Sequence, residues 1–168
     1  MDQKALNKIG QNDSHAFAAL YERLAEPALR FAAAVMGNDS LAADAVQETF
    51  LRVHRNMHRF DTRKPFDPWF YRILLNECRR AMRWRKRLAP VESVPDRAAP
   101  KQDEYRALYE AVGSMETGLR EPLVLHYLMG YRDREIAAIL GVSVVAAKGR
   151  LKRAREKLRQ ELVKGDER

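Results

Sequence analysis

The sequence has 168 residues, 46% of them hydrophobic, and a net charge of +8 at pH 7. The hydrophobic fraction argues against wholesale disorder, and the length accommodates one domain or two small ones. The positive charge favours a polyanionic partner, with nucleic acid ahead of an anionic membrane surface. The single cysteine, Cys78, excludes an internal disulfide and a multi-cysteine zinc site, and we expect a half-buried reduced thiol.

Metal and membrane functions find little support in the sequence. His54 and His58 lie four residues apart, but no third ligand is close in sequence, so a solvated helix face is favoured. The longest near-apolar run, 136–147, is too short to span a bilayer, and no signal-peptide pattern opens the chain. We therefore expect a cytoplasmic protein with no membrane insertion, no metal, no cofactor and no catalytic residues.

Helical periodicity dominates the chain, and no alternating strand pattern is convincing. We predict a helix over 14–36 with a break or kink near Ala25, because Pro27 has no backbone N–H to donate. Turn residues follow, and Ser40 is the expected N-cap of a second helix over 41–57.

A third helix is predicted after a loop over 59–66. Asp67 and Pro68 form the N-cap and first-turn proline pattern, and the helix runs to about Trp84. Residues 87–103 then carry many charges and little apolar periodicity, with prolines at 90, 95 and 100, which predicts a linker. The fold class is therefore all-α, with two small helical domains over 1–86 and 104–168.

The C-terminal part predicts a helix-turn-helix. A short amphipathic helix stops at Gly141, a residue suited to a left-handed C-terminal cap, and Ser143 is the expected N-cap of the next helix. In this motif the second helix lies in the DNA major groove. Helical spacing around Leu151 predicts a buried face of Val144, Ala147, Ala154, Leu158 and Leu162. The same spacing turns outward Val145, Ala146, Gly149, Lys152 and Arg153.

The helix over 41–57 has two faces. An apolar stripe of Val46, Phe50, Val53 and Met57 is the expected core side. The opposite face carries Asp44, Glu48 and Leu51, with Gln47 at its edge. On spacing alone a solvated surface is favoured, but an exposed leucine flanked by carboxylates also suits docking to a basic partner.

The next helix carries a basic stripe opposite its apolar side. It consists of Arg72, Asn76, Arg79 and Arg83, with Arg80 alongside. Because the alternating acids of a salt-bridged surface are missing, nucleic acid is the favoured partner. The preceding loop mixes bases with aromatics and suits unstacked bases, although Phe60 and Phe66 could equally anchor it to the core.

At these positions the sequence resembles the extracytoplasmic-function (ECF) group of bacterial sigma factors. Asp44-Ala-Val-Gln-Glu-Thr-Phe-Leu51 resembles their polymerase-docking segment D-x-x-Q-E-x-F. Arg59-Phe-Asp61, Pro65-Phe-Asp-Pro-Trp69, Arg72-Ile73 and Asn76 resemble the segment for the promoter −10 element. Residues 135–158 resemble the −35 helix-turn-helix. The resemblance covers nearly the whole chain apart from the linker, and the ordered pair of motifs makes it specific.

The resemblance implies a dissociable RNA polymerase subunit for promoter-specific initiation, with core RNA polymerase, promoter DNA and an anti-sigma factor as partners. Polymerase docking then falls on Asp44, Gln47, Glu48 and Leu51. Capture of the −10 element and a flipped base falls on the loop with Arg59, Phe60, Asp61, Arg63 and Lys64, and on Asn76 and Arg79, with Arg80 and Arg83 added from the basic stripe. The −35 contacts fall on Ser143, Val145, Ala146, Lys148, Gly149, Lys152 and Arg153.

Three positions depart from the family pattern. Arg132 stands where a capping serine is usual, so Asp133 is the expected cap, and Pro122 predicts a helix that begins late or bends. The segment Val145-Ala-Ala-Lys-Gly149 lacks two usual hydroxyls, which leaves the −35 sequence open.

Two other functions stay open at this point. An autonomous helix-turn-helix regulator would need a dimer seam to read two half-sites, and none is evident. A nucleic-acid enzyme would need paired carboxylates or a metal constellation, whereas the acids here are scattered.

Overall fold

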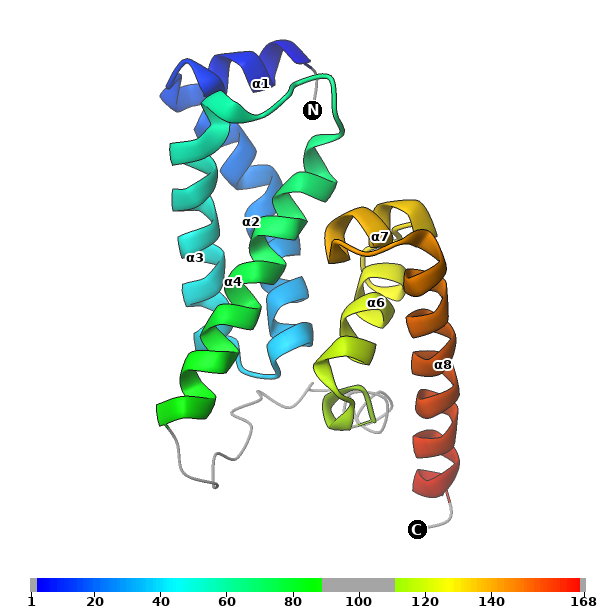
Figure 1. The fold of residues 1–168 in the computed structure, drawn as a ribbon. Helices are drawn as coiled ribbons and strands as arrows, with labels where there is room; N and C mark the ends of the chain where they lie inside the picture. The colour runs from blue at the N-terminus through cyan, green and yellow to red at the C-terminus, as the bar shows by residue number, and fades with distance from the viewer. Residues whose placement is uncertain (1–2, 89–110, 167–168) are drawn as a thin grey trace.

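The computed structural model describes residues 3–88 and 111–166, with side chains up to Val163, and all regular structure in these ranges is helical. The elements are α1 (Gln3–Gly10), α2 (Ser14–Met36), α3 (Asp39–Asn56), the 3-10 turn η1 (Met57–Arg59), α4 (Phe66–Leu88), α6 (Thr117–Tyr127), α7 (Asp133–Leu140) and α8 (Val144–Asp166). In Figure 1, α1 lies across one end of the α2–α4 bundle, and α6–α8 form a second group beside it. The all-α prediction is confirmed for the described residues.

Most of the predicted linker lies outside the described residues. Its first two residues belong to α4, which continues to Leu88 rather than stopping near Trp84. No helix in the described ranges has the length and apolarity needed to cross a bilayer.

Of the predicted break or kink near Ala25, the break is wrong, because α2 is one continuous helix. Pro27 sits inside the helix, and both Leu24 and Ala28 beside it are buried. Packing of this face on both sides of the proline outweighs the loss of one backbone hydrogen bond.

Two N-caps differ from the prediction. Asn38, not Ser40, caps α3, because its Oδ1 accepts from the backbone N–H of Leu41 at 2.8 Å. α4 begins one residue before Asp67, whose carboxylate instead pairs with Arg23 of α2 at 2.7 Å. Asn38 serves the same chemistry as the predicted Ser40, since both are short polar residues next to the start of α3.

Two departures from the family pattern, at Pro122 and Arg132, also have structural consequences other than those expected. α6 begins at Thr117 and contains Pro122, so it does not start late. At the start of α7 the carboxylate of Glu135 accepts from the backbone N–H of Arg132 at 2.9 Å, whereas Asp133 is the first helical residue. The cap therefore comes from the third helical residue reaching back.

The predicted apolar stripe of α3 is confirmed as core, and Phe50 packs at 5.3 Å from the ring of Phe70 on α4. α1, which the sequence did not predict, adds buried Leu6 and Ile9 to this core. Trp84 is 63% exposed, because it lies in the last turns of α4.

Cys78 is fully buried rather than half-buried. Burial is the main cause that raises the pKa of its thiol to about 12, with the nearby Glu121 carboxylate adding to the effect. The thiol therefore stays protonated and unreactive in this structure.

The helix-turn-helix is confirmed. Gly141 adopts φ 69° and its N–H bonds the carbonyl of Ala137, and Ser143 Oγ accepts from the backbone N–H of Ala146 at 3.1 Å. Leu151 is buried as predicted, together with Ala147 and Ala154, whereas Leu158 and Leu162 are partly buried. Val144, at the first residue of α8, is 37% exposed instead.

Replacing each of two glycines of the helix-turn-helix by alanine should change the free energy of unfolding in opposite directions. Gly141→Ala should destabilise the fold by about 1–2 kcal/mol, because an L-residue is strained in the left-handed region. In addition, its Cβ would lie 3.2 Å from Nη2 of Arg72. Gly149→Ala should stabilise by roughly 0.5–1 kcal/mol, because alanine is the better helix former and no atom would crowd its Cβ. Urea unfolding of both variants measures the two shifts, and shifts of the same sign would contradict the prediction.

Candidate nucleic-acid interface

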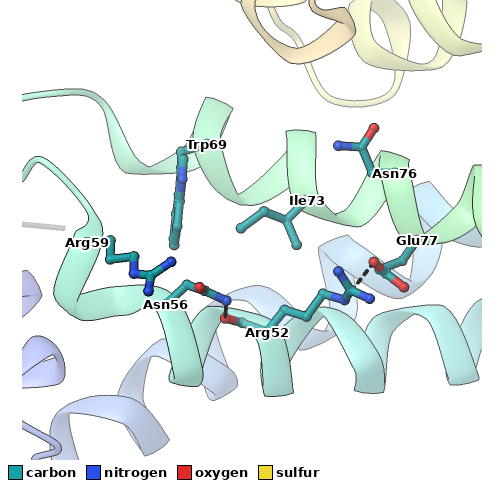
Figure 2. A pocket seen from close by; sticks show the side chains of 7 residues that line it. All are labelled: Arg52, Asn56, Arg59, Trp69, Ile73, Asn76 and Glu77. Atoms are coloured by element: carbon teal, nitrogen blue, oxygen red, sulfur yellow. Dashed lines mark hydrogen bonds and ion pairs between the residues drawn. The ribbon is translucent and has the colours of Figure 1, made fainter.

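A pocket of about 330 Å³ lies between α3 and α4. In Figure 2, Trp69 and Ile73 reach from α4 towards side chains on α3 and η1. This volume is at the lower end of the range for small-molecule sites. The lining residues are Arg52, Asn56, Arg59, Trp69, Ile73, Asn76 and Glu77.

A buried carboxylate fixes one end of the pocket. Glu77 is 4% exposed, and its two oxygens pair with Arg52 at 2.8 Å and with Arg80 at 2.9 Å. Arg52 also contacts Glu48 one turn earlier on α3, at 3.3 Å. Because a buried charge needs compensating partners, this group ties α3 to α4 in one register.

The aromatic wall of the pocket is Trp69. Its ring lies 4.7 Å from that of Phe60 and 5.6 Å from that of Phe66, and both phenylalanines are buried. The loop phenylalanines therefore anchor the loop, which was one of the two alternatives. Trp69 was part of the family motif but was not selected as a site residue, although it is the half-buried aromatic that faces the pocket.

The basic loop beside the pocket is organised by Asp61. Its carboxylate accepts from the Arg63 side chain at 2.9 and 3.0 Å and from the Arg63 backbone at 3.2 Å. These bonds lower the pKa of Asp61 to about 2, with the side-chain bond as the largest cause. The carboxylate therefore shapes the turn, while the Arg59, Arg63 and Lys64 side chains remain exposed.

The predicted basic stripe of α4 does not form one open surface. Arg72, Asn76 and Arg83 are exposed, with Arg72 close to Gly141, but Arg79 is half-buried and ion-paired with Glu121 of α6. Arg80 points to the other side, towards Glu77. The pocket thus receives Asn76 from the stripe, and the C-terminal helices cover part of the rest.

The predicted docking face of α3 borders an apolar groove. Asp44 and Gln47 are exposed, Leu51 is 44% exposed, and Glu48 is partly held by Arg52. Asp44 and Glu48 line a hollow on the α4 side of α3, whereas a groove of about 850 Å³ between α2 and α3 includes Leu51 and Gln47. Sequence spacing missed the α2 contributions to its wall, the exposed Tyr21 and Leu29.

The outward face of α8 is largely open. Val145 is 81% exposed, and Gly149, Lys152 and Arg153 are exposed as predicted, whereas Ala146 is only partly exposed. Lys148 lies 3.7 Å from the carboxylate of Asp133 on α7. The Ser143 hydroxyl is occupied by its N-cap bond.

No group of three or more His, Cys, Asp or Glu side chains within residues 3–88 and 111–163 is placed to hold a metal. Two helical groups, one with an aromatic and basic pocket and one with a helix-turn-helix, define a two-part DNA-binding protein.

Similarity to known proteins supports the assignment to a two-part DNA-binding protein. The Sigma-70 region 2 family matches residues 20–88, and the Sigma-70 region 4 family matches residues 105–158. RNA polymerase sigma factor CarQ of Myxococcus xanthus is 33% identical over 155 residues, which cover 86% of this chain and 88% of CarQ. RNA polymerase sigma factor CnrH of Cupriavidus metallidurans is 33% identical over 133 residues, 68% of this chain and 70% of CnrH.

Two solved structures are similar over most of the chain. CnrH in complex with the cytosolic domain of CnrY gives a TM-score of 0.77 at 30% identity, covering 98% of both chains. The sigma factor RpoE in complex with the anti-sigma factor NepR from Bartonella quintana gives 0.72 at 29% identity, covering 87% of this chain and 97% of RpoE.

The chain belongs to the ECF group of sigma-70-type sigma factors. It therefore serves promoter-specific transcription initiation, as the sequence resemblance implied. An autonomous helix-turn-helix regulator is not favoured, because the region 2 match occupies the N-terminal half.

The pKa of Asp61 offers a direct test of the loop geometry. The folded value of about 2 lies below the ordinary 3.8, so the stabilisation from this turn is present above pH 3.8 and is lost as the pH falls towards 2. Carboxyl-carbon NMR should place the midpoint near 2 in the native protein. Arg63→Ala should move it back towards 3.8, while Lys64→Ala, which removes a minor contribution, should change it little.

Proposed function

We propose that the pocket between α3 and α4 receives one unstacked base of the promoter −10 element. The observation that carries this proposal is one pocket lined by the half-buried Trp69 ring and the exposed Asn76, with Ile73 between them on α4 and basic side chains at the rim. An indole face stacks on any base, and an amide can bond a base edge. Arg59, Arg63 and Lys64 of the adjoining loop then bind the phosphates on either side.

Removing the stacking ring or the amide should impair promoter melting. Trp69→Leu and Asn76→Ala should each lower open-complex formation on duplex promoters by roughly tenfold, in line with 1–3 kcal/mol for one stacked base. The loss should be smaller on templates with a pre-melted bubble, because their strands are already separated and no free energy is needed to melt them. Run-off transcription with core RNA polymerase on matched templates measures both.

Trp84→Leu is the matched control, since Trp84 is an exposed tryptophan of the same helix outside this pocket. It should leave the ratio of duplex to bubble activity unchanged. Equal defects of the Trp69 and Asn76 variants on both templates would assign these residues to packing or polymerase binding instead.

The acidic face of α3 is the proposed docking surface for core RNA polymerase. Gln47 and Leu51 line the apolar groove between α2 and α3, and Asp44 and Glu48 lie on the neighbouring side of α3 that faces α4. A partner helix with apolar residues for the groove and basic residues for Asp44 would match both features.

Charge reversal tests this docking surface. Asp44→Lys should weaken binding to core RNA polymerase by at least about tenfold, because a like charge opposite a basic partner costs several kcal/mol. Glu22→Lys makes the same change at an exposed α2 position that does not line the groove, and it should bind normally. Co-purification with core measures both, and normal binding by Asp44→Lys would show that this face is only solvated.

For the −35 element we propose that Lys152 and Arg153 read base edges, because Val145, Ala146 and Gly149 offer no side-chain hydrogen bonds. Lys148 then contacts phosphate, exchanging its weak exposed pair with Asp133.

The −10 functions belong to a domain over 1–86, the −35 functions to one over 104–168, and residues 87–103 join them. The separate family matches over 20–88 and 105–158 support this division.

The remaining assignments follow from family membership. The protein acts in the cytoplasm, with the polymerase, and has no catalytic activity of its own. An anti-sigma factor is its proposed regulator, supported by the similar RpoE that was solved with the anti-sigma factor NepR.

A further inference from the structure

The two helical groups are held together by contacts that include α4, the helix proposed to bind the −10 element. α4 packs against α7, and α2 packs against α6; Figure 1 shows α6 and α7 facing this side of the N-terminal bundle. The contacts are both polar and aromatic, and they fall on part of the basic stripe.

The central contact is a two-pronged ion pair. Arg79 Nε donates to Glu121 Oε1 at 2.7 Å, and Arg79 Nη2 donates to Glu121 Oε2 at 2.5 Å. Glu121 is 1% exposed, and the bond to its carboxylate is the main cause that raises the pKa of Arg79. A planar guanidinium recognises carboxylate and phosphate with the same fork geometry. Glu121 therefore occupies Arg79 as a DNA phosphate would.

Three further contacts hold the same arrangement. Arg120, next to Glu121, donates to the carbonyl of Val35 in the last turn of α2 at 2.8 Å. The rings of Tyr71 on α4 and Tyr131 before α7 meet at 5.6 Å, and burial raises the pKa of both phenols. Arg72 lies against Gly141 at the C-terminal end of α7.

We propose that Glu121 is an internal competitor of promoter DNA, which closes the free protein by holding Arg79 until DNA phosphate replaces it. This inference rests on the proposed role of α4 in −10 binding and adds its regulation. In the closed state Arg79 is held by Glu121 of α6, whereas Arg72 stays exposed beside Gly141. Contact of a DNA phosphate with Arg79 and the Arg79–Glu121 pair are therefore mutually exclusive.

A buried ion pair suits such a switch. Bringing two charges out of water costs nearly as much as their attraction returns, so opening, which rehydrates both, need not be strongly unfavourable. Removing one charge alone leaves the other buried without a counter-charge, which favours the open state. Closure then lowers the apparent DNA affinity by the fraction of molecules that are open.

The test compares full-length wild type with Glu121→Gln, which keeps the shape and removes the charge. Binding of a short fluorescein-labelled single-stranded DNA of mixed sequence is followed by anisotropy at one low salt concentration. Glu121→Gln should bind about tenfold more tightly, as expected if about one tenth of the wild type is open. Small-angle X-ray scattering of the free variant should show a larger radius of gyration.

Glu116→Gln is the matched control, because Glu116 is exposed and directly precedes α6. It should match wild type in both measurements. The double swap Arg79→Glu/Glu121→Arg restores opposite charges, so it should return the radius of gyration to the wild-type value without the gain in affinity. If Glu121→Gln does not fold, Tyr131→Leu, which removes another closing contact, should give the same expansion and tighter binding.

Unchanged affinity in a Glu121→Gln protein, whether or not it expands, overturns the proposal. Failure of the base pocket is a separate result: Asn76→Ala placed in the Glu121→Gln background should weaken DNA binding. If it does not, the base pocket fails, while the gain from Glu121→Gln still supports competition at Arg79.

Discussion

α4 packs against α2 and α3 on one side and against α7 on the other, so almost every part of the molecule depends on how this helix is placed. Its buried face supplies the aromatic core, with Phe70 and Tyr71 in contact with Phe50 and Phe31. Its next face holds Glu77 against α3, and the third holds Arg79 against α6. A rotation of α4 that relieved one of these contacts would break the other two, which is why the proposed pocket has a defined shape.

The buried charges act mainly on specificity. Glu77 and Glu121 are each 4% exposed or less, and each is paired with arginine from a different helix. Such pairs add little net stability compared with apolar side chains of the same size, but a wrong register would leave a carboxylate buried and unpaired. Glu77 is held by two arginines, Arg52 of α3 and Arg80 of α4. Among the described residues Glu121 is ion-paired with Arg79 alone, and under the proposed function that arginine has DNA phosphate as an alternative partner.

The sequence predicted what local periodicity controls. The α3 stripe, the Gly141 cap and the Ser143 cap are confirmed, because each depends on residues within one or two turns. The caps at Asn38 and Glu135 were missed, since neighbouring polar residues fit the same position equally well. The pocket wall at Trp69 and the pair of Arg79 with Glu121, 42 residues apart, depend on packing between elements. Spacing along one helix carries no information about either.

Two weak DNA contacts become one strong interaction only when both engage the same promoter. Joining the −10 and −35 parts raises the effective concentration of the second contact, provided that the geometry permits both at once. In the proposed closed state this advantage is lost, because α7 packs against α4, the helix proposed to receive DNA. A modest preference for closure therefore reduces binding to isolated sites more than binding to a full promoter, where two elements together favour the open state. Selectivity for paired elements would then arise partly from the interface between the two helical groups, and not from base contacts alone.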